Sequence, residues 1–185
     1  LTDKLSLNVY GVIRNGFNFE NFAVYEKNFE KQQVTISMIF ADHPMKGVDQ
    51  GLECLRRIKL LHPDCKILLF GFKVPPKLDF EFEYVRRPIK ERLRQVYKQT
   101  DIVICPSLQE GWHNPPSEAM AAQCAVVATN VGSVPYTIKN GENGFVVDPG
   151  DVEQMIFSVS KLIEDAKRKF KYATFESSDL IYFLN

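Results

Sequence analysis

Apolar residues along the chain fall into short unbroken runs that alternate with segments of helical period. A run with no polar alternation predicts a strand that is buried on both faces of a sheet. Strands of this kind are predicted at residues 34–40, 66–70, 82–85, 101–105, 124–129 and 144–147. An apolar stretch at residues 9–13 predicts one further strand near the start of the chain.

Between these runs, apolar positions recur every three or four residues, which indicates amphipathic helices. Residues 48, 52, 55, 58 and 61 predict a helix that Pro63 ends, and residues 89, 93, 96 and 97 mark the apolar face of a second helix. A short helix is predicted at residues 135–139 and a long one over residues 152–166. Lys90, Arg94 and Lys98 form a basic stripe on the second helix; we interpret it as a solvated face, with docking to a membrane or a partner as the alternative.

The alternation of strands and helices predicts an α/β fold, a Rossmann-like three-layer α/β/α domain with a mostly parallel sheet. In this prediction residues 34–170 form the domain, residues 1–33 are an entry segment and residues 171–185 are a short tail. Ligands of such sheets bind beyond the carboxyl ends of the strands. The loops expected at that edge cover residues 41–46, 71–77, 86–88 and 110–114.

At 185 residues the chain is long enough for one well-buried domain. Its 23 basic and 23 acidic residues give a formal net charge of zero, which argues against a polyanionic partner such as nucleic acid. The four cysteines show no C-x-x-C spacing, so a reducing, cytoplasmic setting is expected. No apolar run approaches the roughly 18 residues of a membrane span. Because the chain begins with Leu1, we expect it to be a piece of a longer protein.

Two acids follow the strand predicted at residues 101–105. Glu110 stands on the loop that leaves this strand, and Glu118 comes after seven intervening residues. Because Asn is a good N-cap and proline fits the first turn of a helix, Asn114 and Pro115 predict a helix start. Glu118 is then expected in the first turn, at the positive end of the helix.

The same stretch offers a pocket for a polyhydroxylated, phosphorylated ligand. Carboxylates accept hydrogen bonds from sugar hydroxyls, and free loop amides can point at phosphate oxygens. The amides in question belong to Gly111, Trp112, His113 and Asn114. Because Pro115 and Pro116 have no N–H, the loop must supply most of these donors.

The run E-G-W-H-N-P-P-S-E-A-M-A, which starts at Glu110, resembles the E-x7-E motif of retaining GT-B glycosyltransferases of family 4, the group 1 type. These enzymes transfer sugars from nucleotide-sugar donors. Further stretches are similar to motifs of the same family and occur in the same order. They are V-I-R-N-G-F-N at residues 12–18 with Phe22, K-G-V-D at 46–49, A-V-V-A-T-N-V-G at 125–132 and N-G-E-N-G-F-V-V-D-P at 140–149.

The resemblance implies roles for the charged residues. Glu118 would hydrogen-bond the nucleotide ribose, and Glu110 would contact the transferred sugar and help to stabilise positive charge at its anomeric carbon. Lys46 would neutralise the donor diphosphate, where leaving-group charge grows. The alternatives are a helix acid favoured by the helix dipole for Glu118, a solvated loop acid for Glu110 and a surface lysine for Lys46.

The resemblance also implies roles for neighbouring residues. Trp112 and His113 would form the loop wall against the sugar. His113 would also donate a hydrogen bond to phosphate, with an exposed loop histidine as the alternative. Gly16 would let the donor approach the backbone closely, or would only serve the Asn15-Gly16 turn.

The sequence departs from the family pattern in one position that matters for catalysis. An arginine usually stands shortly before the lysine, whereas this chain has Phe40 and Ala41 there. We expect Arg86, Arg87 or a residue of the missing half to take its place. Further departures are Gln123, Ser133 and Tyr136.

The sequence therefore predicts the carboxyl-terminal, donor-binding half of a retaining glycosyltransferase. It would bind a nucleotide-diphosphate sugar, and the acceptor, a glycan or a lipid-linked molecule as in polysaccharide biosynthesis, would be held by an amino-terminal domain that this chain lacks. No cofactor and no metal are expected, because no D-x-D-type acidic pair occurs in the expected loops. The expected location is the cytoplasm, at the inner face of the membrane and in peripheral contact with it.

Two other functions stay open: a non-catalytic sugar-nucleotide-binding module, and a nucleotide-sugar epimerase or phosphorylase of the same fold. As half of a glycosyltransferase, the isolated chain is expected to bind a nucleotide or nucleotide sugar weakly and to transfer no sugar alone. A dinucleotide dehydrogenase is set aside, because no G-x-G-x-x-G follows a strand.

Overall fold

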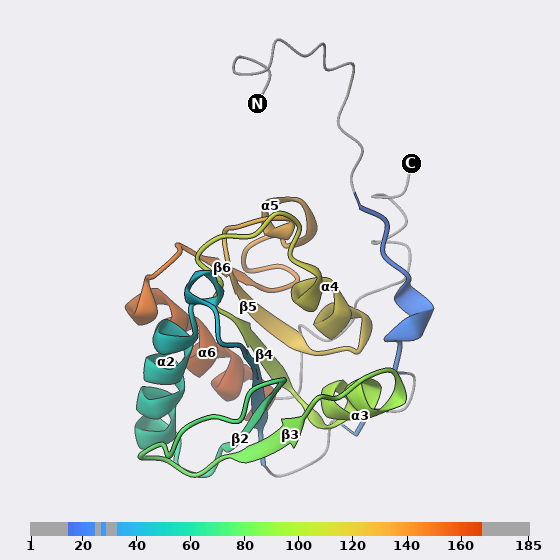
Figure 1. Ribbon diagram of the computed structural model, residues 1–185. Coiled ribbons are helices and arrows are strands. Elements are labelled where there is room, and N and C mark those ends of the chain that lie inside the picture. The colour runs from blue at the N-terminus through green and yellow to red at the C-terminus, as the bar shows by residue number, and fades with distance from the viewer. Residues whose placement is uncertain (1–14, 25–26, 29–32, 168–185) are drawn as a thin grey trace.

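A computed structural model of the chain describes residues 15–24, 27–28 and 33–167 (Figure 1). The strand predicted at residues 9–13, much of the entry segment and the tail at residues 171–185 lie outside the described residues. The proposed division of the chain into entry segment, domain and tail therefore stays a prediction.

The described residues contain one sheet of six strands in the order β3-β2-β1-β4-β5-β6, and every neighbouring pair is parallel. The strands are β1 (Thr35–Phe40), β2 (Lys66–Gly71), β3 (Glu83–Arg86), β4 (Ile102–Cys105), β5 (Ala125–Thr129) and β6 (Phe145–Val147). The predicted parallel sheet is confirmed, and both ends of each of the six strands predicted between residues 34 and 147 lie within about one residue of the observed ends. The strand order is that of a doubly wound dinucleotide-binding sheet.

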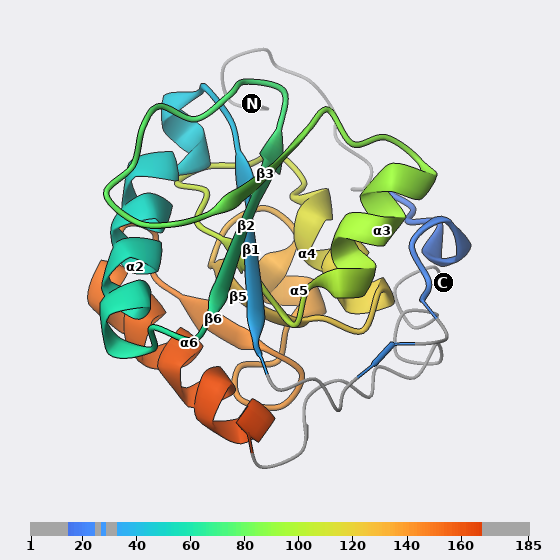
Figure 2. The same ribbon diagram turned by 90° about the horizontal axis from the view of Figure 1, so that it is seen from below.

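Helices cover both faces of the sheet, which gives three layers (Figures 1 and 2). One face carries α2 (Val48–Leu61) and α6 (Val152–Lys167), and the other carries α3 (Glu91–Gln99), α4 (Asn114–Ala121) and α5 (Val134–Thr137). Two short 3-10 helices, η1 (Phe19–Asn21) and η2 (Pro44–Lys46), complete the described elements.

Each strand contributes alternate side chains to two separate apolar cores. On β4, Ile102 and Ile104 pack in the core under α2 and α6, whereas Val103 and Cys105 pack in the core under α3 and α4. Because both faces of the strand are covered, the sequence of the strand is apolar throughout and shows no alternation. This is the physical reason why the apolar runs predicted the strands so closely.

Three local predictions need correction. The loop predicted at residues 41–46 contains η2, and the short helix predicted at residues 135–139 lies at Val134–Thr137. Asn114 is not the N-cap of α4: it is the first helical residue, His113 is the N-cap, and no side chain caps the helix. Glu118 therefore lies beyond the first turn, which contains no acid. Proline is tolerated throughout the first turn, where amides lack intrahelical partners, so a proline pair leaves the start of a helix uncertain by one residue.

Candidate functional site

The strand order brings the loops after β1 and β4 to one point at the carboxyl edge of the sheet. These two strands are neighbours, yet the chain leaves β1 for α2 on one face and leaves β4 for α4 on the other. A crevice opens where two neighbouring connections part in this way, and ligands of doubly wound sheets bind there. The loop after β1 carries Lys46, and the loop after β4 carries Glu110.

Lys46 and Glu110 form an ion pair between these two loops, with 2.7 Å between Nζ and Oε1. The hydroxyl of Ser107 donates to the same carboxylate oxygen at 2.8 Å. The Glu110 side chain is 13% exposed and the Lys46 side chain 42%, so the pair is open to solvent from the lysine side. The structure thus brings together two residues that the sequence analysis selected from separate motifs 64 positions apart.

Close backbone contacts hold the two loops against each other. The amide of Leu108 donates to the carbonyl of Met45 at 2.7 Å. Gly47 has a φ of +60°, and a Cβ at this position would overlap the carbonyl oxygen of Pro106. A larger residue would therefore push apart the loops that carry Lys46 and Glu110.

The charge states of the site follow from these contacts. Burial alone would raise the pKa of Glu110, but the hydrogen bonds from Lys46 and Ser107, together with the charge effects of His113 and Lys46, lower the pKa. Burial lowers the pKa of His113 to about 4, against the opposing effect of Glu110 and with the help of Lys46. At neutral pH the carboxylate is ionised and the imidazole is neutral. Nε2 of this imidazole lies 3.9 Å from Oε1 of Glu110 and 3.5 Å from Oγ of Ser107.

Glu118 is held differently. Its Oε2 accepts a hydrogen bond from the hydroxyl of Tyr97 on α3 at 2.9 Å. Burial raises the pKa of Glu118, and the tyrosine hydrogen bond only partly offsets this effect. Glu118 and Glu110 both raise the pKa of the Cys105 thiol, after the larger effect of burial, so the two carboxylates lie around the end of β4.

The loop between the two acids supplies backbone donors. Within the described residues, no hydrogen bond occupies the amides of Gly111, Trp112, His113 or Asn114. Gly111 and Asn114 are exposed and Trp112 is half-buried, whereas the His113 side chain is buried beside Ser107 and Glu110. The role of Trp112 and His113 as a wall against a sugar stays a prediction.

Two other predicted site residues have no described contact with the ion pair. Gly16 is exposed, with open space around its Cα. Arg87 follows β3, the edge strand, where its guanidinium lies 5.8 Å from the centre of the Phe72 ring. No described contact joins Arg87 to Lys46 or Glu110, so the replacement of the missing arginine by Arg87 stays a prediction.

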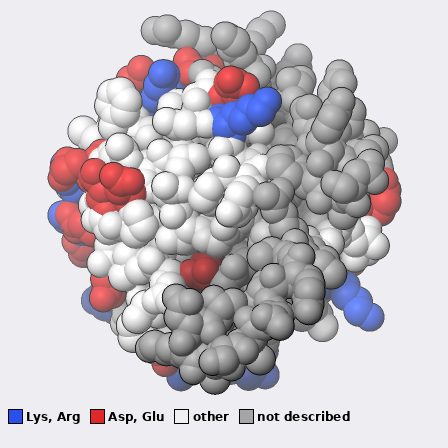
Figure 3. Space-filling model, turned by 90° about the horizontal axis from the view of Figure 1, so that it is seen from above, with Lys and Arg blue, Asp and Glu red and all other residues white. Residues whose placement is uncertain are grey.

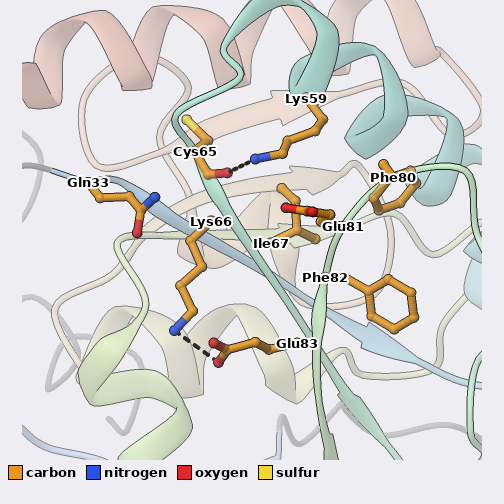
Figure 4. A pocket seen from close by; sticks show the side chains of 9 residues that line it. All are labelled: Gln33, Lys59, Cys65, Lys66, Ile67, Phe80, Glu81, Phe82 and Glu83. Carbon is orange, nitrogen blue, oxygen red and sulfur yellow. Dashed lines mark hydrogen bonds and ion pairs between the residues drawn. The ribbon is translucent and has the colours of Figure 1, made fainter.

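Among the hollows lined by described residues, two lie beside the sheet, and no predicted site residue lines either of them. One, of about 790 Å³, opens beyond the carboxyl ends of β1 and β2, and its lining includes Phe40, Lys73 and Leu108. The other, of about 610 Å³, lies at the amino ends of β2 and β3 (Figure 4). There Lys66 pairs with Glu83 at 2.9 Å, and Lys59 donates to the carbonyl of Cys65 at 2.7 Å.

Several residues of the site were not selected from the sequence. Ser107 bonds Glu110, and Ser133, noted above only as a departure from the family pattern, donates through its hydroxyl to the carbonyl of His113 at 2.8 Å. Tyr97 was assigned only to the apolar face of a helix. A tyrosine on such a face must find a partner for its hydroxyl, and this was the available signal.

The family described as glycosyl transferases group 1 matches residues 31–165, which is most of the chain. The chain belongs to the group 1 glycosyltransferases. A solved structure of the C-terminal domain of the group 1 glycosyltransferase LpcC from Francisella tularensis has a TM-score of 0.72 and 26% sequence identity, over 90% of this chain and 97% of that one. The domain described here is therefore a carboxyl-terminal domain of this glycosyltransferase family, as the sequence predicted.

Among relatives with an assigned role, the capsular polysaccharide biosynthesis glycosyltransferase CapM of Staphylococcus aureus is 25% identical over 167 residues, which are 82% of this chain and 44% of CapM. The sulfoquinovosyl transferase SQD2 of Arabidopsis thaliana is 29% identical over 66% of this chain and 26% of SQD2. The chain thus spans less than half the length of these group 1 relatives. Anabaena HepE, solved in complex with UDP and glucose, shares the fold with a TM-score of 0.72 at 20% identity.

The described residues contain no group of three or more His, Cys, Asp or Glu side chains that could hold a metal ion. None of the helices in residues 15–24, 27–28 and 33–167 has the length and apolar character needed to cross a bilayer.

On the face seen in Figure 3, charged side chains of both signs lie mainly around the rim of the described surface. Arg94, the middle residue of the predicted basic stripe, bonds the Glu20 carbonyl at 2.9 Å and pairs with Glu91 at 3.3 Å.

Proposed function

We propose that this domain binds the nucleotide-diphosphate sugar of a retaining hexosyltransferase. The observation that carries the proposal is the Lys46–Glu110 ion pair at the point where the connections after β1 and β4 part. A cation and a carboxylate side by side match a donor in which a diphosphate adjoins a hydroxyl-bearing sugar. Without a ligand, the two side chains neutralise each other.

In the proposed complex, the Lys46 ammonium turns to the diphosphate, where it stabilises the negative charge that grows on the leaving group. Glu110 then accepts hydrogen bonds from sugar hydroxyls, and its negative charge stabilises positive charge at the anomeric carbon. The lowered pKa of Glu110 suits this role, because the group must be ionised. The amides from Gly111 to Asn114 donate to phosphate oxygens, and no described group occupies them.

Glu118 completes the proposed nucleotide site. A carboxylate can accept from both hydroxyls of a ribose, and one of its oxygens is already held by Tyr97. The acceptor, a glycan or a lipid-linked molecule, would be held by an amino-terminal domain outside this chain. The domain is therefore expected to bind donors but to transfer no sugar alone.

Calorimetric titration with UDP, GDP, ADP and dTDP tests this proposal. We expect one nucleotide to bind the wild type, and Glu118→Ala to weaken it by about tenfold or more, because a hydrogen bond to a charged group is lost. Glu142→Ala removes an exposed acid on the α5–β6 connection and should not change the affinity. Equal affinity of wild type and Glu118→Ala for all four nucleotides would remove the proposed role of Glu118.

One observation favours a second candidate, a non-catalytic nucleotide-sugar-binding module. The end of β1 carries Phe40 and then Ala41 where the family usually has an arginine, so a single lysine faces the proposed diphosphate position. Joining the chain to its natural upstream half and measuring both binding and transfer separates the two candidates. Donor binding without transfer supports the module, and transfer supports the enzyme.

A further inference from the structure

Tyr97 occupies an unusual place for a residue with a hydroxyl group. It is completely buried in the apolar core under α3 and α4, and its ring contacts two others nearly at right angles. Phe70 of β2 lies 5.7 Å away between ring centres, and Phe22, directly after η1, lies 6.3 Å away. Rings held from two sides cannot turn freely, so the direction of the Tyr97 hydroxyl is fixed.

This hydroxyl donates its hydrogen bond to Oε2 of Glu118. No hydrogen bond to Oε1 of Glu118 is found within the described part of the chain. One carboxylate oxygen is therefore fixed by the core, and the other is left for a ligand.

We infer that Tyr97 is the positioning residue of the nucleotide site: its hydroxyl orients Glu118 so that the second carboxylate oxygen meets the ligand hydroxyls. The inference rests on the proposed function and adds a residue that touches no ligand itself. It also gives the entry segment a part in the site, because Phe22 packs on the positioning ring.

The pKa of Glu118 is a readout that would not change if Tyr97 served only to fill the core. Burial raises the pKa of Glu118, and the Tyr97 hydrogen bond holds this increase down. The titratable groups facing Glu118 are Tyr97 from α3 and the Cys105 thiol from β4, and burial raises the pKa of both, so both stay protonated at neutral and acid pH. Among the described groups around this carboxyl, Glu118 alone changes charge in that range.

The test compares Tyr97→Phe with wild type by titrating the tightest binder among UDP-glucose, GDP-mannose, ADP-glucose and dTDP-glucose from pH 4.5 to 8. These are phosphate diesters that keep their charge over this range, so the pH dependence reports the protein. We expect Tyr97→Phe to weaken binding about threefold to tenfold at neutral pH, by the loss of one hydrogen bond. The pH at which affinity is half lost should move upward, because the pKa of Glu118 rises.

Thr100→Val is the matched control, since it removes another buried hydroxyl bond of α3, from Oγ1 of Thr100 to the carbonyl of Val96 at 2.8 Å. It should lower the melting temperature without moving the pH midpoint. An unchanged midpoint and affinity in Tyr97→Phe, with binding lost in Glu118→Ala, would overturn the positioning role and leave the proposed function intact.

A second measurement does not depend on nucleotide binding. Carbon-13 NMR of the Glu118 carboxyl in the free protein reports its pKa directly, and Tyr97→Phe should raise it. Glu118→Gln keeps an acceptor for Tyr97 but cannot titrate, so nucleotide-sugar binding by this variant should lose its dependence on pH between about 5.5 and 8. This range lies above the pKa of His113, which is about 4, and above the lowered pKa of Glu110. A dependence that persists in Glu118→Gln would assign the titration to another group and contradict the inference.

If no nucleotide or nucleotide sugar binds the wild type, the proposed function fails. An unchanged Glu118 pKa in Tyr97→Phe would overturn the positioning role by itself.

Discussion

Glu110 and Glu118 belong to one motif, yet their surroundings shift their pKa values in opposite directions. Glu110 lies on a loop and receives hydrogen bonds from Lys46 and Ser107, which lower its pKa although burial opposes them. Glu118 lies within α4, and burial raises its pKa further than the Tyr97 hydrogen bond lowers it. Two identical side chains with seven residues between them thus differ in how readily they lose their charge.

This difference fits two different tasks. A group that stabilises positive charge must stay ionised, and an ion pair with a lysine ensures this. A group that only accepts hydrogen bonds from hydroxyls depends more on direction than on a low pKa, and a buried phenol supplies direction. The predictions below separate the two environments by changing one and leaving the other intact.

The largest effect is expected where the Glu110 loop touches the Lys46 loop. Gly47→Ala places a methyl group against the carbonyl of Pro106 and forces a non-glycine residue to a φ of +60°. We expect a loss of about 3 kcal/mol or more in the free energy of unfolding, measured in urea. Gly141→Ala is the control, because it has a φ of +78° but nothing within 4 Å. It should lose only about 1 kcal/mol, and equal losses would show that the loop contact is unimportant.

Lys46→Met removes the cation from Glu110 and should lower stability at pH 7 by about 1 kcal/mol, as for a pair that is partly open to solvent. Because the pKa of Glu110 is lowered in the folded state, its stabilising effect is present above the unfolded pKa and disappears as the pH falls through the folded pKa. The free energies of unfolding of the wild type and of Lys46→Met, measured in urea, should therefore become equal at acid pH. Lys46→Arg, which keeps the charge, should follow the wild type, and a constant gap at every pH would contradict the ion-pair explanation.

Glu118→Gln, in contrast to Lys46→Met, should increase the free energy of unfolding. The pKa of Glu118 is raised in the folded state, so its ionisation above that pKa opposes folding, and a neutral amide removes this cost. We expect a gain of about 0.5–1 kcal/mol at pH 7 that shrinks as the pH falls. Glu142→Gln, at an exposed acid 3.9 Å from Lys139, makes the same charge change and should give no gain. A loss of stability in Glu118→Gln would show that the carboxylate is not strained by burial.

The sequence predicted the sheet well because burial on both faces leaves a strong local signal, as in β4 and β5. It also placed Lys46 and Glu110 at the same edge of the sheet, because both follow predicted strands. The fold makes these two strands neighbours. The hydrogen bond from Tyr97 to Glu118 joins residues 21 positions apart and depends on how α3 packs against α4. No local pattern encodes such a contact.

Lys27 makes a second long-range contact that no local sequence pattern predicts. It lies in the predicted entry segment, yet it is buried with 9% of its surface exposed. Its ammonium donates to the carbonyls of Ala122 and Gln123 at 3.0 and 2.9 Å, just after α4. A buried lysine needs hydrogen-bond acceptors, and the carbonyls at the end of a helix are available because they have no partner within the helix. The first of these acceptors lies 95 positions away from Lys27 in the sequence.

The smallest expected effect concerns the end of the helix that carries Glu118. Gln123 has a φ of +57°, a conformation that glycine adopts without strain, and the family commonly has glycine at this position. Gln123→Gly should stabilise the protein by about 0.5 kcal/mol, because the relief of strain exceeds the added freedom of the unfolded chain. The Gln123 carbonyl that accepts from Lys27 is kept, so nucleotide affinity should not change.

Gln123→Ala keeps the strain and serves as the control for loss of the long side chain. Thermal unfolding should rank Gln123→Gly above both the wild type and Gln123→Ala. If Gln123→Gly instead weakens nucleotide binding as Tyr97→Phe is expected to do, the end of α4 contributes to the placement of Glu118. The difference between the two carboxylates would then depend on the whole helix, in addition to the hydroxyl of Tyr97.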